Sequence, residues 1–324
     1  MKRTEIGISI KKAKLLLDRS EIVSIPTETV YGLAANGNNK QAIAKIYAAK
    51  KRPLSNPLIL HYKDASSAFK DVTIVPKDAE TLAENFWPGP LTMLLPKKQT
   101  IPDSVTAGKN RVAIRVPQHK LCQALLETLA YPLAAPSANL YGKISPTSPT
   151  HVKEQLNKRI PYILDGGICE KGIESTIIGF ENDTPIIYRL GSISIEEIEA
   201  CIQKNIRLKN KPENNQEVLA SGMVKHHYAP NTIMLSIAEK HEGKNLENCG
   251  FIGFDTLHPD FPNENQFLLD ENGNLDAAAK ELYSAFHIMD AKEFSSIYIQ
   301  FLPDIGIGKA VNDRIKRAIQ KYNS

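Results

Sequence analysis

Residues Glu21–Leu33 read EIVSIPTETVYGL, and this stretch decides how the first part of the chain is organised. The β-rich run Glu21–Ile25 predicts a short strand, which Pro26 ends because proline cannot donate to a sheet ladder. Three short polar residues, Thr27–Thr29, follow directly. Side chains at the carboxyl end of a strand are well placed to line a ligand crevice in an α/β sheet. An ordinary turn that caps the next element explains the same residues equally well, so both interpretations stay open.

Outward from this stretch, short apolar runs alternate with segments of helical periodicity. The runs typical of strands are Leu58–His61, Leu91–Leu95, Val112–Val116, Leu133–Ala135, Ile160–Leu164, Thr176–Phe180 and Ile186–Arg189. The segments typical of helices are Ser9–Arg19, Lys40–Lys51, Lys77–Asn85, Lys120–Leu129 and Pro149–Leu156. Because strands and helices are interleaved, we expect a layered α/β domain.

A change in composition marks a domain boundary after residue 203. Residues Lys204–Glu217 are rich in Lys, Asn, Pro and Glu and have no strong periodicity. Beyond them, a small β-α-β-α unit with a parallel sheet is predicted by strands at Ile233–Ser236, Gly250–Phe254 and Ser295–Gln300 and by helices at Leu275–Met289 and Lys309–Lys321. We therefore expect a first domain at 1–203, a linker at 204–231 and a second domain at 232–324.

The composition argues against several classes of protein. Hydrophobic residues make up 42% and charged residues 23%, which are ordinary globular values. No apolar run approaches a membrane span, and no apolar segment of a secretory signal follows the charged N-terminus. The four cysteines contain no C-x-x-C pair, so we expect reduced thiols in a cytoplasmic protein rather than a zinc site.

Cations gather in the first part of the chain: residues 1–200 carry 26 Lys and Arg against 20 Asp and Glu, whereas residues 201–324 carry 14 against 16. Lys50–Pro57 reads KKRPLSNP, and its three cations end a predicted helix, where they interact favourably with the negative end of the helix dipole. The two prolines stiffen the loop that follows, and such a loop could clamp a triphosphate. Strand alternation puts Arg111 and Arg115 on the same face, which is costly unless that face meets an anion or water. Solvated lysines and arginines on the surface are a sufficient explanation of the basic excess, so the net charge does not distinguish between possible functions.

Further polar residues follow other predicted strands. They are PSAN at 136–139 with GKISPT at 142–147, DGG at 165–167 with EST at 174–176, and YRLG at 188–191. So many polar or cationic strand ends in one domain favour a single polar cavity, which suits a charged ligand of nucleotide size.

These motifs, in this order and spacing, resemble a known family. PTETVYGL, KKRPLSNPLILH, FWPGPLTMLL, VAIRVP, PLAAPSANLYGKISPT, DGG, ESTII and YRLG are together similar to the YrdC-type domain of L-threonylcarbamoyladenylate synthases. SGMVKHHYAP looks like the linker of the long, two-domain form, and GIGKAVNDRIKRA looks like the last helix of its small Rossmann-like domain. The resemblance implies a twisted open mixed sheet around a positively charged cavity, and an ordered linker to the second domain.

The resemblance also implies a reaction, in which L-threonine, bicarbonate and ATP give threonylcarbamoyl-AMP and pyrophosphate. Mg²⁺ would accompany ATP, with no protein side chain as a metal ligand. The product would pass to a tRNA threonylcarbamoyl transferase complex in the cytoplasm. That complex would modify the adenosine next to the anticodon of the tRNA. Contact of this chain with tRNA would be at most indirect, and no membrane is implied.

Individual residues take roles by matching the family's motifs. Lys50 and Arg52 are implied to be catalytic, because they would neutralise charge on the phosphates. The implied threonine contacts are Thr29, His61, Arg115, Ala135 and Ser175. The implied ATP contacts are Arg52, Asn56, Arg111, Ser137, Asn139, Ser145, Arg189, His227 and Tyr228, of which the last two would fold over the cavity mouth.

Three alternatives remain open at this stage. A basic concave domain could bind RNA through its backbone, although the charge excess is modest and aromatic residues are not interleaved with the cations. Domains of this type also occur inside enzymes that process carbamoyl phosphate, although the cysteine spacing here offers no zinc finger. The second domain could bind a separate effector.

Overall fold

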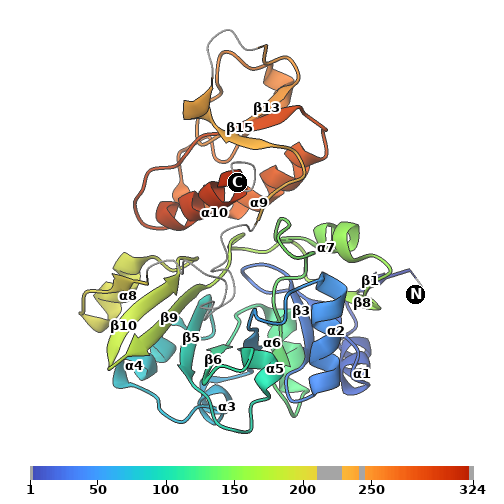
Figure 1. Cartoon of the computed structure of the whole chain (residues 1–324), viewed down its shortest axis with the longest axis vertical. Helices are drawn as coiled ribbons and strands as arrows, with labels where there is room; N and C mark the ends of the chain where they lie inside the picture. The colour runs from blue at the N-terminus through green and yellow to red at the C-terminus, as the bar shows by residue number, and fades with distance from the viewer. Residues whose placement is uncertain (1–2, 210–227, 241–244, 321–324) are drawn as a thin grey trace.

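The computed structural model describes residues 3–209, 228–240 and 245–320. Figure 1 shows a large domain and a smaller one, whose helices α9 (Leu275–Asp290) and α10 (Gly308–Gln320) face the large domain. The predicted fold class, a mixed α/β sheet with a second small α/β domain, is confirmed. Most of the expected linker, residues 210–227, lies outside the described part of the chain. Within the described ranges, no helix is long and apolar enough to span a membrane.

The large sheet has eleven strands in the order β1-β8-β2-β3-β7-β4-β6-β5-β9-β10-β11. Their bounds are β1 Glu5–Gly7, β2 Val23–Ile25, β3 Gly32–Asn36, β4 Ile59–His61, β5 Leu91–Pro96, β6 Arg111–Arg115, β7 Leu133–Ala134, β8 Tyr162–Leu164, β9 Thr176–Glu181, β10 Thr184–Arg189 and β11 Arg207–Leu208. The sheet is mixed, with parallel pairs such as β4 with β6 and antiparallel pairs such as β5 with β6. Because β11 pairs with β10, the large sheet extends past residue 203 into the expected linker.

Eight helices of the described residues belong to this domain. They are α1 Ile10–Asp18, α2 Lys40–Lys50, α3 Ala65–Phe69, α4 Lys77–Phe86, α5 Asp103–Thr106, α6 Lys120–Glu127, α7 Pro149–Leu156 and α8 Ile195–Ile202. Their starts follow ordinary capping chemistry. Asn39 accepts hydrogen bonds at the start of α2, and Ser194 and Glu197 form a reciprocal capping box on α8.

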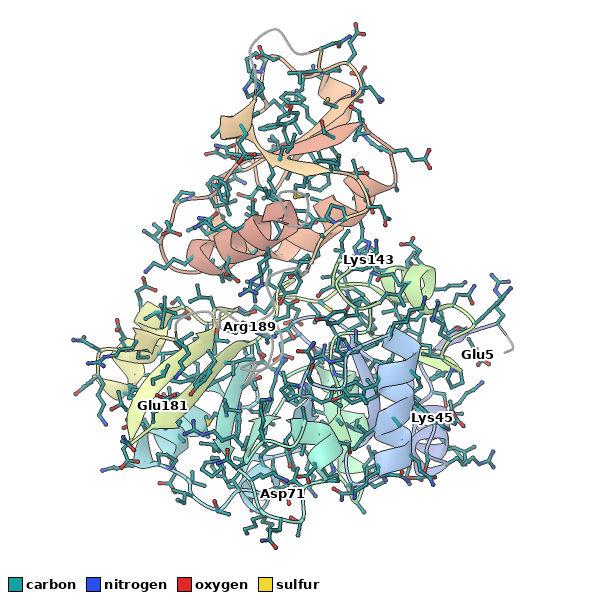
Figure 2. All side chains as sticks on the ribbon, viewed as in Figure 1. Glu5, Lys45, Asp71, Lys143, Glu181 and Arg189 are labelled. Atoms are coloured by element: carbon teal, nitrogen blue, oxygen red, sulfur yellow. The ribbon has the colours of Figure 1, made fainter. Side chains whose placement is uncertain are left out.

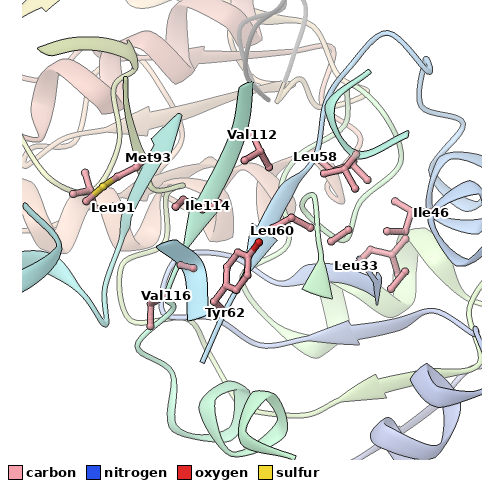
Figure 3. Packing of buried hydrophobic residues seen from close by; sticks show 14 of the residues in the cluster. Leu33, Ile46, Leu58, Leu60, Tyr62, Leu91, Met93, Val112, Ile114 and Val116 are labelled. Carbon is pink, nitrogen blue, oxygen red and sulfur yellow. The ribbon is translucent and has the colours of Figure 1, made fainter. Parts of the chain in front are cut away.

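Strand alternation divides the interior between the two faces of the large sheet. Val112, Ile114 and Val116 of β6 and its continuation pack into the main core, together with Leu60 of β4 (Figure 3). The opposite face carries two clusters. One includes Leu17 of α1 and residues of α6, and the other is a small cluster around Ala113. Arg115 shares the face of Ala113, as the alternation predicts.

The second domain contains four parallel strands in the order β12-β15-β13-β14. Their bounds are β12 Met234–Ser236, β13 Cys249–Gly253, β14 Gln266–Leu268 and β15 Ser296–Ile299. The parallel sheet expected from the β-α-β-α pattern is therefore present, with β14 as a further edge strand. Its helices α9 and α10 bury an apolar core that reaches across to loops of the large domain.

Candidate functional site

A cavity lies where loops following several strands of the large sheet meet. Eight residues predicted as site residues line it, namely Thr29, His61, Arg115, Ala135, Ser137, Ser175, Arg189 and Tyr228. Other lining residues include Thr27, Ile59 and Glu174. Figure 2 shows Arg189 at the end of β10 that faces the second domain, with Glu181 at the far end of the same hairpin. Polar residues from several of the strand ends seen in the sequence are thus brought into one site.

Arg115 organises one wall of this cavity. Its Nη2 lies 2.7 Å from Oε1 of Glu28, and its Nη1 donates to Oγ1 of Thr29 at 3.0 Å. Its Nε donates to the backbone oxygen of Gly89 at 3.2 Å. All three side chains of the Glu28–Arg115–Thr29 group are buried. The guanidinium is therefore fixed in direction before any ligand arrives.

His61 lies beside Arg115 at the neighbouring strand end. Burial, assisted by the positive charge of Arg115, lowers the pKa of His61 to about 3. The ring is therefore neutral at physiological pH. Its buried Nδ1 makes no hydrogen bond to the described residues, so a ligand donor would satisfy it.

Arg189 and Ser175 form another stretch of the cavity wall. Nη2 of Arg189 donates to the backbone oxygen of Ser175 at 2.8 Å and to its Oγ at 3.0 Å. The same hydroxyl lies 2.8 Å from Oγ1 of Thr92 on β5. Burial lowers the pKa of Arg189, although it stays a cation, so this wall presents a desolvated positive charge.

Lys50 brings the end of α2 to the loop that follows β7. Its Nζ donates to the backbone oxygens of Ser137 and Asn139, and both Lys50 and Asn139 are buried. Lys51 then turns the chain with a left-handed backbone, at φ 54°. Burial, and then the charge of Arg52, holds the pKa of Lys50 well below its usual value. Three residues predicted for catalysis or ATP binding are thus in direct contact.

Arg52 and Asn56 lie in the stiff loop after α2. Arg52 Nη2 donates to the backbone oxygen of Pro57 at 3.0 Å, and Asn56 Nδ2 donates to the Tyr141 hydroxyl at 3.0 Å. Burial lowers the pKa of Arg52, which is also sensitive to the charges of Tyr228 and Arg189. Its head group therefore belongs to the same electrostatic environment as the cavity.

Lys50, Arg52, Asn56 and Asn139 lie behind the cavity wall and do not line the cavity themselves. The other three predicted contacts lie elsewhere or outside the described residues. Ser145 does not line the cavity, but its Oγ donates to Oε1 of the lining residue Glu174 at 2.7 Å. Arg111 lies at the start of β6, where its Nη1 is 3.4 Å from the Tyr188 hydroxyl, so it is separated from Arg115 by the length of the strand. His227 lies outside the described residues.

The structure adds residues that the sequence motifs left without a role. Glu174 lines the cavity and is contacted by Tyr283 and Arg314 of the second domain. Glu28 anchors Arg115. Arg314 did carry a sequence signal, since it interrupts the apolar stripe of α10 that includes Val311.

This arrangement is suited to a polyanion. Lys50, Arg52 and Arg189 are buried cations, and burial disfavours the charged form of each. A phosphate group brought among them would offset that cost through charge-assisted hydrogen bonds. Within the described residues, no group of three or more His, Cys, Asp or Glu is placed to hold a metal ion.

Comparison with known proteins covers both domains. A family model described as telomere recombination matches residues 15–191, and one described as threonylcarbamoyl-AMP synthase, C-terminal domain, matches residues 193–319. The threonylcarbamoyl-AMP synthase of Bacillus subtilis (strain 168) is 39% identical over 330 residues, covering 95% of this chain and 92% of that protein. The protein of the same name from Pyrococcus abyssi is 35% identical over 326 residues, covering 95% and 93%. A crystal structure of P. abyssi Sua5 complexed with L-threonine matches with a TM-score of 0.87 and 34% identity, covering 98% of each chain.

Proposed function

Because this chain belongs to the threonylcarbamoyl-AMP synthase family, we propose that it converts L-threonine, bicarbonate and ATP to threonylcarbamoyl-AMP and pyrophosphate. The observation that carries the proposal is a group of buried cations at one cavity: Arg189 and Arg115 line it, Lys50 donates to the backbone oxygen of the lining residue Ser137, and the charge of Arg189 acts on Arg52. Lys50, Arg52 and Arg189 suit a triphosphate, and Arg115 suits the carboxylate of an amino acid.

The reaction divides into two balanced steps. The uncharged amine of threonine attacks bicarbonate, so that a C–N bond forms and water leaves with the carbamate as product. A carbamate oxygen then attacks the α-phosphorus of ATP, and the bond from that phosphorus to the bridging oxygen of pyrophosphate breaks. No side chain needs to form a covalent intermediate, so positioning and charge neutralisation carry the catalysis.

The residues divide into a threonine group and an ATP group. Arg115, held by Glu28, would bind the threonine carboxylate, with Thr29, His61, Ala135 and Ser175 around the rest of the molecule. Neutral His61 would accept a hydrogen bond through Nδ1.

The ATP group would be formed around the buried cations. Lys50 and Arg52 would neutralise the phosphates, and the remaining nucleotide contacts would be Asn56, Arg111, Ser137, Asn139, Ser145, Arg189, His227 and Tyr228. Tyr228 is buried at the cavity and stands where the chain enters the second domain, which suits a cover that excludes water from a labile product.

Mg²⁺ would be held by the phosphates of ATP rather than by the protein. The buried carboxylates nearest the cavity, Glu28 and Glu174, are each paired with an arginine. When bound, the ion would neutralise charge on the phosphate oxygens during displacement. The product would then be used in the cytoplasm by a tRNA threonylcarbamoyl transferase complex, and this chain would touch tRNA at most indirectly.

The test is pyrophosphate release by the purified protein with ATP and Mg²⁺, with and without L-threonine and bicarbonate. We expect release to require both co-substrates. Arg52→Ala should lower the rate at least about tenfold, since losing a charge-assisted hydrogen bond costs about 1.5–3 kcal/mol. Arg19→Ala, which removes an exposed arginine from the end of α1, is the matched control. Release that ignores threonine, or salt-sensitive RNA binding without ATP consumption, would contradict the proposal.

A further inference from the structure

The core of the second domain includes loops of the first. Val30, Ile144 and Ile173 belong to the same buried cluster as Phe286 of α9 and Val311 of α10. Each lies next to, or two residues from, a predicted site residue. Val30 follows Thr29, Ile144 precedes Ser145, and Ile173 is two residues before Ser175. The loops that carry the site are therefore packed from outside by the second domain.

The loop before Ser175 lies against helix α9 at backbone distance. Gly172 has φ +72°, and a Cβ at this position would lie 2.3 Å from the backbone oxygen of Lys280 and 2.4 Å from its Cα. Only glycine allows this approach. The loop and the helix are thus in direct contact, with no side chain between them.

Glu174 is the polar link across this contact. Its Oε1 accepts from Ser145 Oγ at 2.7 Å, and both oxygens lie within 3.1 Å of the Tyr283 hydroxyl. Nε of Arg314 donates to Oε2 at 3.0 Å, and Nη2 of the same residue donates to the backbone oxygen of Leu190 at 2.7 Å. The Arg314 side chain is fully buried, and that of Glu174 is 7% exposed.

The charge state of Glu174 follows from these neighbours. Burial would raise the pKa of this carboxyl group, but Arg314, Arg189 and the Ser145 hydroxyl outweigh it, so the pKa lies below its usual value. An ionised carboxylate only accepts hydrogen bonds, and it therefore fixes the Ser145 hydroxyl as a donor to itself. The lone pairs of that hydroxyl remain directed elsewhere.

We propose that Tyr283 and Arg314 of the second domain are positioning residues for the ATP side of the cavity, acting through Glu174 on Ser145 and on the Glu174–Ser175 backbone. Two anchors from different helices hold one carboxylate, and that carboxylate orients a hydroxyl predicted to contact the nucleotide. The second domain is thereby part of the site's support, although neither anchor lines the cavity. This inference rests on the proposed function for the role of Ser145.

The test is Tyr283→Phe, which removes only the hydroxyl that contacts Glu174. Tyr298→Phe is the matched control, because Tyr298 is an equally buried tyrosine of the second domain that packs in a different cluster. We expect Tyr283→Phe to raise KM for ATP about fivefold, the factor that corresponds to about 1 kcal/mol of hydrogen-bond energy, with kcat and melting temperature close to wild type. The control should leave KM for ATP unchanged.

A double-mutant cycle separates positioning from general support. In a Ser145→Ala background the added Tyr283→Phe change should raise KM for ATP no further, because the oriented hydroxyl is already absent. Equal KM values for Tyr283→Phe and Tyr298→Phe, or additive effects of Tyr283→Phe and Ser145→Ala, would overturn the proposal. Titration calorimetry of ATP on the same variants gives a readout without turnover. If the wild type binds ATP but releases no pyrophosphate, the proposed function fails while the calorimetry still decides this inference.

Discussion

The Arg115–Glu28 pair allows stability and substrate binding to be separated by experiment. Arg115→Met keeps most of the apolar stem but leaves Glu28, which is 1% exposed, without the guanidinium at 2.7 Å. Removing one partner of a buried pair strands a charge, which typically costs about 3–5 kcal/mol. The double variant Arg115→Met with Glu28→Gln strands no charge and should recover most of that loss.

Protonation of the stranded carboxylate sets an upper limit on the loss of stability in Arg115→Met. A carboxyl group with the ordinary solution pKa of about 4.3 can be protonated at pH 7 for about 4 kcal/mol, so a stranded carboxylate cannot destabilise the protein by more than that. At pH 5 the same limit is about 1 kcal/mol. For domains of about 150–250 residues each kcal/mol lowers the melting temperature by about 2–4 °C. We therefore expect Arg115→Met to melt about 10 °C below wild type at pH 7 and only a few degrees below it at pH 5.

Scanning calorimetry at both pH values, with threonine titration beside it, gives the readout. The double variant should regain the melting temperature without regaining threonine binding, because Arg115 itself is the proposed contact for the carboxylate. Two results would refute the reasoning. One is a loss of stability in Arg115→Met that is the same at pH 5 and pH 7. The other is a double variant that melts no higher than the single one.

Three further changes test other parts of the molecule. Lys50→Met should weaken ATP binding about 10- to 100-fold in titration calorimetry, because a charge-assisted hydrogen bond worth about 1.5–3 kcal/mol is lost. An unchanged Kd for ATP would exclude Lys50 from the phosphate site. His287 stacks on His151 with ring centroids 3.9 Å apart, and burial lowers the pKa of His287 to about 4. Between pH 6.5 and 4 the unfolded state therefore binds more protons than the folded state, so the free energy of unfolding falls as the pH falls through that window. His287→Phe should reduce this fall by up to about 3 kcal/mol in urea titrations. An unaltered dependence of the free energy of unfolding on pH would contradict this. Gly172→Ala should expose the domain junction to limited proteolysis. Gly108→Ala is the control and should not, because Gly108 also has a positive φ (+78°) but a Cβ there would have no neighbour within 4 Å. Equal cleavage of the two variants would show that backbone strain alone is responsible.

The fold class and many elements could be predicted because their residues carry local signals. The alternation in β6 correctly separates Arg115 from Val112 and Ile114. Strand β3 was not predicted, since four of the five residues of Gly32–Asn36 (GLAAN) are Gly, Ala or Asn, which have weak strand propensity. It forms because neighbouring segments supply its hydrogen bonds, including one from Leu33 N to the backbone oxygen of Pro136 at 2.7 Å. Tertiary pairing, rather than local preference, decides this strand.

The candidate site divides in a similar way between local and long-range information. The motif matches located the residues on the strand ends, and eight of them line one cavity. Direct contacts such as Lys50 with Ser137 needed coordinates, because they join residues from different elements. The contribution of Tyr283 and Arg314 depends on how two domains sit against each other, which no local pattern specifies. The single hint was a charged residue within the apolar stripe of α10.

The placement of Arg314 also affects which group the Arg189 side chain contacts. Glu174 lies close enough to both arginines for each to lower the pKa of its carboxyl group. The hydrogen bonds of Glu174 go to Ser145, Tyr283 and Arg314, while Arg189 donates to Ser175. Without the second domain, Arg189 would be left as the arginine whose charge acts on Glu174, and an ion pair between them would compete with the contact to Ser175. By supplying its own arginine, the second domain leaves Arg189 directed at the cavity wall, where the proposed reaction needs its charge.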